Sequence, residues 1–88
     1  MEILINLMED AVMQTIDELH RKNKFHLCEK CRLDITAIAL NNLAPRYTVT
    51  QKGTSYAKAE LLELQRQIDL IGEVNKAINI VTNNPRHV

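Results

Sequence analysis

The sequence is poor in glycine, proline and aromatic residues. Its 88 residues include two glycines, two prolines and three aromatic side chains. The two glycines, Gly53 and Gly72, stand alone, so no glycine-rich loop that cradles phosphate groups is present. The chain instead is rich in Leu, Ile, Ala, Glu, Lys and Gln, most of which favour helix.

The sequence also lacks an excess of positive charge and a long apolar run. Eleven Lys and Arg residues balance eleven Asp and Glu residues. Because nonspecific nucleic-acid binding depends on cationic side chains, we expect no direct binding to DNA. No apolar run reaches the roughly 20 residues of a membrane-spanning helix, and the Met1-Glu2 start lacks the basic region of a secretory signal. We therefore expect a cytoplasmic protein with no membrane association.

The spacing of apolar residues predicts three helices. Apolar side chains recur every three or four residues over 3–22, 31–43 and 55–81. Residues 47–50 favour a strand, but they are too few for a sheet of their own, so this segment is expected to stand alone or to pair with its copy in a second subunit. The prediction is one all-α domain over 1–88, with a short extended segment between the second helix and the long C-terminal helix.

The C-terminal helix carries two apolar edges, and one of them predicts a homodimer. The 27 residues of 55–81 would make a helix roughly 40 Å long, more than a domain of this size needs. One edge follows the spacing of a coiled-coil seam with a single polar member: Ala57, Leu61, Leu64, Ile68, Ile71, Asn75 and Ile78. The second edge consists of Leu62, Leu70, Val74 and Val81. One edge is expected to cover the first two helices and the other to meet a second copy; burial of both in a monomer is the alternative.

Both cysteines of the chain lie in one short turn. Cys28 and Cys31 have the CxxC spacing, and His26 precedes them by two residues. Structural zinc takes four Cys or His ligands, so we expect His26 as the third ligand and His87 as the fourth, with His20 as its alternative. Four protein ligands leave no position for water, so this zinc would be structural. Two other interpretations stay open: reduced thiols packed as small apolar side chains, and a redox dithiol, although the βαβ pattern typical of one is missing.

From Cys28 to Gly53 the chain reads CEKCRLDITAIALNNLAPRYTVTQKG. This stretch resembles the late competence ComFB family, which typically reads CxxCRxDVxALALNxLPPRYVVTxxG. The chain departs from that pattern at Ala44, where the family often has proline, and at Thr48, where it often has valine. Its ending, Asn84-Pro85-Arg86, is similar to the Pro-Arg ending of family members.

The resemblance implies a small, helical, dimeric, cytoplasmic bacterial protein associated with competence for DNA uptake. Some members are similar in binding zinc through cysteines around the CxxC and near the C-terminus, where this chain has His26 and, slightly displaced, His87. Others, notably cyanobacterial ones, are implied to be receptors for cyclic di-nucleotides, especially cyclic di-GMP.

The chemistry of a nucleotide suggests which side chains would bind one. Guanine edges suit arginine and carboxylate groups, phosphates suit Arg and Lys, and base faces suit Arg or Tyr. Such groups are close in sequence at Arg32, Asp34, Arg46, Tyr47 and Lys52. The alternative is a local ion pair of Arg32 with Asp34 and a Tyr47 that caps the core.

The leading hypothesis is a receptor for cyclic di-GMP or cyclic di-AMP that signals to a protein partner. The alternative is a zinc-stabilised adaptor that binds no nucleotide. We expect no enzyme activity, since the one acid–base pair in reach, Asp34 with His26, is better suited to supporting a metal ligand.

Overall fold

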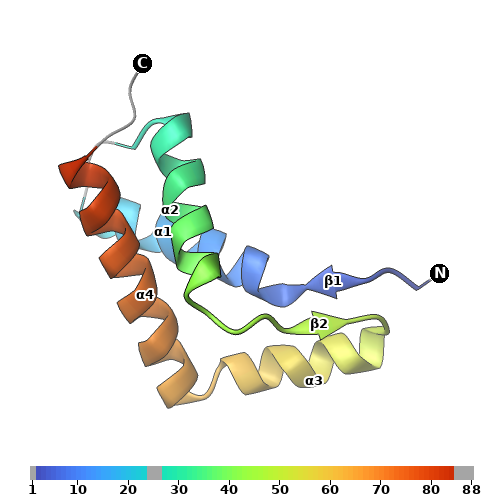
Figure 1. The fold of residues 1–88 in the computed structure, drawn as a ribbon. Helices are drawn as coiled ribbons and strands as arrows, with labels where there is room; N and C mark the ends of the chain where they lie inside the picture. Colours follow the sequence, from blue (N-terminus) through green and yellow to red (C-terminus); the bar gives the residue numbers. More distant parts are fainter. Residues whose placement is uncertain (1, 24–26, 85–88) are drawn as a thin grey trace.

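The computed structural model describes residues 2–23 and 27–84, which form four helices and one two-stranded sheet (Figure 1). In chain order the elements are β1 (Ile5–Asn6), α1 (Leu7–Asn23), α2 (Glu29–Asn41), β2 (Tyr47–Thr48), α3 (Gln51–Leu61) and α4 (Leu64–Asn83). The mainly helical character is as predicted, but the described chain has one helix more than expected and a sheet. None of these helices combines the length and the apolar character that crossing a membrane requires.

The first helix begins later than its apolar pattern suggested. Asn6 precedes α1, and its side-chain oxygen accepts a hydrogen bond from the backbone N–H of Met8 at 3.2 Å. This is the action of a helix N-cap. The preceding residues are extended, and β1 pairs antiparallel with β2, Ile5 opposite Thr48. The prediction that segment 47–50 stands alone or pairs with a second copy is therefore wrong for β2, whose partner is β1 of the same chain.

Side-chain caps also start α2 and α3. Cys28 is the N-cap of α2, and its sulfur accepts from the backbone N–H of Cys31 at 3.3 Å. Thr50 is the N-cap of α3, and its hydroxyl accepts from the N–H of Gly53 at 3.0 Å. The helix predicted from residue 55 therefore begins four residues earlier, at Gln51.

The hydrophobic core lies between α1, α2 and α4. Its largest fully buried side chains are Val12 and Ile16 of α1, Ile35 of α2 and Val74 of α4. Around them pack Met8, Cys31, Ala39, Leu70, Ala77, Ile78 and Val81. Three helices that each contribute one apolar face account for the core, as the spacing predicted.

The long C-terminal helix predicted over 55–81 is wrong, because α3 and α4 are separate helices. The first of these helices ends at Leu61, the backbone is extended at Glu63, and α4 departs from α3 at a sharp corner (Figure 1). The side-chain amide of Gln67 donates a hydrogen bond to the carbonyl of Leu61, which has lost its helical partner at the break.

The break decides which apolar edge of α4 is buried. Leu70, Val74 and Val81 of the second edge are in the core, whereas Leu64, Ile68 and Ile71 of the predicted seam are exposed. The seam is therefore interrupted between α3 and α4, although Ala57 and Ile78 at its ends are buried. Among the described residues, an exposed apolar stripe remains on α4.

Candidate functional site

The two cysteines lie on the first turn of α2 as free thiols. Cys28 is half-buried and Cys31 is buried. The hydrogen bonds that Cys28 receives, first from the backbone N–H of Cys31 and then from its thiol, lower the pKa of Cys28. The same thiol–thiol bond, together with burial, raises the pKa of Cys31. A thiolate is the form that binds metals, so this turn is suited to donating sulfur ligands.

Only these two of the predicted zinc ligands lie in the described part of the chain. His26 and His87 fall outside residues 2–23 and 27–84. Within those ranges no three His, Cys, Asp or Glu side chains gather as a metal site would require. The alternative ligand, His20, lies in the last turn of α1. Cys28 and Cys31 thus present two sulfur donors on one turn, which fits half of a tetrahedral zinc site.

Arg32 forms an ion pair that the sequence did not suggest. Its guanidinium contacts the carboxylate of Asp17 on α1 at 2.6 Å. The hydrogen bond from Arg32 lowers the pKa of Asp17, and the same bond raises the pKa of Arg32. The pair joins α1 to α2. Asp34, the local partner considered for Arg32, is half-buried on the same helix.

Arg46 is anchored at the opposite end of α1. Its backbone N–H donates to the side-chain oxygen of Asn6 at 2.9 Å, and its carbonyl accepts from the N–H of Leu7 at 2.8 Å. Its guanidinium contacts Glu60 of α3 at 3.1 Å, while its Nε is buried and has no hydrogen-bond partner in the described chain. The neighbouring Tyr47 is exposed, and Lys52 is exposed in the first turn of α3.

The structure divides the predicted nucleotide-binding residues into two groups. Arg32 contacts Asp17, whereas Arg46 contacts Leu7, ten residues earlier on the same helix. Ten helical residues correspond to about 15 Å along the helix axis. Arg32 and Asp34 therefore lie near one end of α1, and Arg46, Tyr47 and Lys52 lie near the other.

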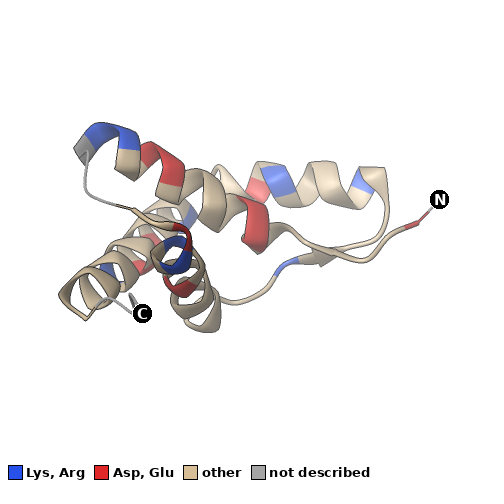
Figure 2. Cartoon of the chain, turned by 90° about the horizontal axis from the view of Figure 1, so that it is seen from above, with Lys and Arg blue, Asp and Glu red and all other residues tan. Residues whose placement is uncertain are grey.

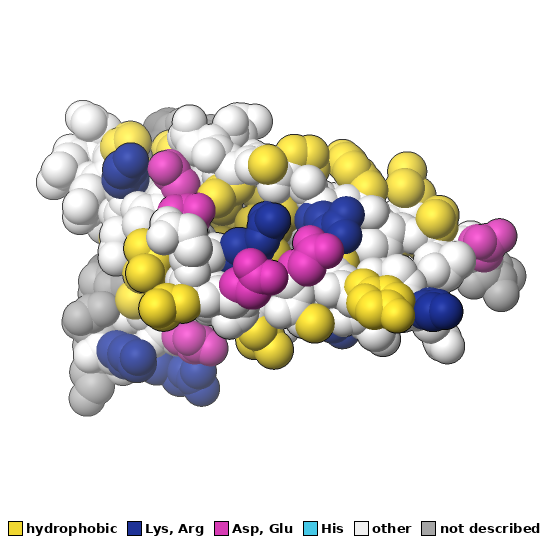
Figure 3. Space-filling model, turned by 90° about the horizontal axis from the view of Figure 1, so that it is seen from below, with side chains coloured by type: hydrophobic (Ala, Val, Ile, Leu, Met, Phe, Trp, Pro, Cys, Tyr) yellow, Lys and Arg dark blue, Asp and Glu magenta, His cyan; other side chains and the backbone are white. Residues whose placement is uncertain are grey.

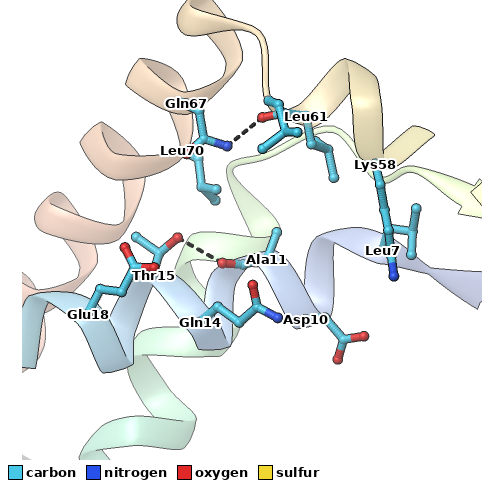
Figure 4. A pocket seen from close by; sticks show the side chains of 11 residues that line it. Leu7, Asp10, Ala11, Gln14, Thr15, Glu18, Lys58, Leu61, Gln67 and Leu70 are labelled. Carbon is cyan, nitrogen blue, oxygen red and sulfur yellow. Dashed lines mark hydrogen bonds between the residues drawn. The ribbon is translucent and has the colours of Figure 1, made fainter. Parts of the chain in front are cut away.

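A groove of about 430 Å³ lies between α1 and the corner where α3 meets α4 (Figure 4). Apolar side chains make its floor, and they come from α1, α3 and α4: Leu7, Ala11, Leu61 and Leu70. Polar side chains make its rim, and they come from α1 and α3: Asp10, Gln14, Glu18 and Lys58. Concave surfaces of this size, apolar with a few polar groups, are typical of binding sites.

Sequence reasoning missed Asn6, Asp17 and Glu60. Asn6 carries a recognisable signal, since Glu9 follows three residues later, as in a capping box. The uninterrupted apolar spacing from Ile3 onward obscured it. Asp17 and Glu60 have no such signal, because their arginine partners are distant in sequence.

The comparisons with known proteins agree with the fold. The family model described as "Late competence development protein ComFB" matches residues 5–85. The competence protein ComFB of Bacillus subtilis (strain 168) is 27% identical over 79 residues, which cover 90% of this chain and 78% of that protein. The solved structure of the late competence protein ComFB from Bacillus subtilis superposes with a TM-score of 0.77 at 24% identity, covering 98% of this chain and 96% of that one.

The family match extends over nearly the whole chain, and it confirms the resemblance noted between Cys28 and Gly53. It also spans every helix and both strands that the structure describes. The chain belongs to the ComFB family of late competence development proteins.

Proposed function

We propose that this protein is a non-catalytic adaptor in competence, which acts by binding other proteins. The observation that carries this proposal is the exposed apolar surface. Outside the α4 stripe, Leu62 is 77% exposed, Tyr56 64% and Val49 51%. Hydrophobic side chains also gather toward the strands on the face that α3 presents (Figure 3). Large exposed apolar patches mark interaction sites in proteins of this kind.

Charge does not favour a nucleic-acid partner for this adaptor. Lys and Arg residues are distributed over the helices among Asp and Glu residues rather than gathered on one face (Figure 2). Both arginines of the predicted ligand site also form ion pairs with carboxylates of this chain. A protein partner is therefore the better match to this surface. The test is affinity capture of the tagged chain from competent cells with chemical crosslinking. Recovery of one specific partner supports the adaptor, and its absence at full expression contradicts it.

A second copy of the chain is the first partner we propose. Leu64, Ile68 and Ile71 follow the spacing of four and three that packs against another helix. Light scattering should give twice the mass of one chain. Ile68→Lys should reduce it to one chain, whereas Gln65→Lys, an equally charged change at an exposed polar position of α4, should leave the dimer intact. A wild-type protein with the mass of one chain would contradict this arrangement.

We also propose that the CxxC turn holds a structural zinc ion. Cys28 and Cys31 would supply two sulfur ligands, with His26 and His87 as the other two. Metal analysis should find about one zinc per chain. Cys28→Ser combined with Cys31→Ser should abolish it and lower the melting temperature, while His87→Ala should weaken retention during dialysis against a chelator. If the metal-free wild type is as stable as the zinc-loaded protein, zinc does not stabilise the fold.

A receptor for cyclic di-nucleotides is the second candidate, and one observation favours it. The side chain of Arg46 is 42% exposed, its buried Nε has no partner among the described residues, and Tyr47 beside it is exposed. Arginine donors suit guanine edges and phosphates, and tyrosine can stack on a base. Lys52 would add a phosphate contact.

Calorimetry with cyclic di-GMP and cyclic di-AMP tests this candidate. Arg46→Ala should abolish binding, and Arg66→Ala, which removes an exposed arginine of α4 instead, should preserve it. The absence of measurable heat with either nucleotide at concentrations well above the micromolar range would leave the adaptor as the only function of the two.

A further inference from the structure

The groove between α1 and the α3–α4 corner has the features of a docking site, and its walls limit what it can bind. Its lining residues belong to helices, except Leu62 in the turn between α3 and α4, and the interior backbone groups of helices are already hydrogen-bonded. The groove therefore offers side chains and almost no free backbone N–H or C=O groups. An extended peptide would find almost no hydrogen-bond partners there for its backbone N–H and C=O groups, whereas in a helix these groups are already hydrogen-bonded to one another.

The floor of the groove is apolar. Leu7 and Leu70 are only 5% and 4% exposed, and they are joined by Ala11 and Leu61. Figure 4 shows Leu61 and Leu70 pointing from above toward α1. Beside them Leu62 is 77% exposed and extends the apolar surface past the corner. The apolar face of an amphipathic helix matches a floor of this kind.

The rim of the groove has its own charge pattern. Asp10, Gln14 and Glu18 follow one another at intervals of four on α1, so they form one row along the groove. Neither carboxylate forms an ion pair with another described residue, and Lys58 stands on the α3 side. The two carboxylates are eight residues apart, or about 12 Å along the axis. They suit two basic side chains at a similar separation: two residues seven apart on a partner helix lie about 10.5 Å apart along its axis and on nearly the same face.

We propose that this groove docks an amphipathic helix of a protein partner, with lysine or arginine side chains facing Asp10 and Glu18 and apolar side chains between them. The inference rests on the proposed adaptor function and adds to it the site and the chemistry of the partner. Along α1 the site extends from Leu7 to Glu18, about 16 Å, which is room for roughly three helical turns of the partner.

A labelled synthetic helix is the direct probe. It carries leucines at spacings of three and four with two lysines about seven residues apart, and a twin peptide has glutamates in place of the lysines. Fluorescence anisotropy with the full chain should show binding of the lysine peptide and much weaker binding of its twin. Asp10→Lys combined with Glu18→Lys should lower the affinity for the lysine peptide by about tenfold or more. Gln14→Trp, which fills the groove, should block it, with circular dichroism verifying that each variant is folded.

Glu9→Lys is the matched control, since Glu9 is an exposed acid of the same helix that does not line the groove. It should change the affinity by less than about twofold. Equal binding of both peptides, or equal loss in Glu9→Lys, would overturn the proposal, because either result indicates nonspecific attraction. A halved mass of the Asp10→Lys/Glu18→Lys protein in light scattering would also overturn it, because a second copy would then occupy the groove.

Capture from competent cells separates this proposal from the adaptor function itself. A partner that the Asp10→Lys/Glu18→Lys variant still captures would overturn the groove as its site and leave the adaptor standing. A partner captured by the wild type and by Glu9→Lys, but lost with the groove variants, supports both. The absence of any partner together with no peptide binding contradicts both.

Discussion

Asn6 connects three parts of the fold, and replacing it with alanine should cost about 2 kcal/mol of stability. Its side-chain oxygen accepts from Met8 at 3.2 Å and from Arg46 at 2.9 Å. Loss of an N-cap costs about 1 kcal/mol, and a backbone N–H left without a partner costs about 1–3 kcal/mol when buried. Asn6 is half-buried, so water partly replaces the lost bonds, and the lower end of the sum, about 2 kcal/mol, applies. In a domain of this size that corresponds to a melting temperature lower by about 8–16 °C.

Urea unfolding followed by circular dichroism measures this effect, at one protein concentration so that any association is held constant. Asn6→Asp is the matched control, because its carboxylate can accept the same two hydrogen bonds and suits the positive end of α1. It should stay within about 0.5 kcal/mol of the wild type. An alanine variant as stable as the wild type, or an aspartate variant that falls equally far, would show that these two bonds do not hold the strand, helix and loop together.

Three further changes test other parts of the fold by the same measurement. Thr50→Ala should lose about 1 kcal/mol of stability because the hydroxyl that caps α3 is removed, while Thr50→Ser keeps the hydroxyl and the stability. Equal losses in both variants would show that the hydroxyl does not stabilise α3. Gly72→Ala should gain about 0.5–1 kcal/mol, because no atom lies within 4 Å of an added methyl group in this helix; a loss would indicate hidden crowding. Asp17→Asn should cost at most about 1 kcal/mol at neutral pH, since the pair with Arg32 is partly exposed. The lowered pKa of Asp17 means that its contribution is present above the ordinary value of 3.8 and is lost as the pH falls through the lowered one, so the difference between the proteins should close in acid; a constant difference would contradict this.

Apolar periodicity predicted the core well and the element boundaries less well. Val12 and Ile16 follow the apolar spacing that predicted a helix over 3–22, and both are fully buried. Leu4 follows the same spacing, yet it is exposed and precedes the helix. The pattern continued through Leu4 by coincidence of spacing, whereas the cap at Asn6 determines where helical hydrogen bonding begins. A local polar signal therefore outweighs an apolar repeat at a helix end.

The candidate site shows the same division between local and distant information. The turn of Cys28 and Cys31 was predictable, because both thiols lie within one helical turn. The separation of the predicted nucleotide-binding residues was not, because Arg32 lies in the first turn of α2 and Arg46 follows the end of that helix, which places them near opposite ends of α1. Neighbours in sequence that flank a helix are separated by its length. The carboxylates that bind these arginines come from α1 and α3, and a single sequence contains no signal for such pairs.

The corner at Leu62 and Glu63 was beyond local reasoning for a different reason. Both residues are compatible with a helix, and the apolar spacing continues across them, so every local pattern predicted one rod. A straight rod, however, would carry α3 away from α1. Ala57 would then leave its buried position, and Lys58 and Leu61 would no longer face α1 across the groove. Burial of both helices against the same core thus favours the break, and the bond from Gln67 to the freed carbonyl of Leu61 lowers its cost. The feature that makes the C-terminal prediction wrong is therefore the one that creates the groove.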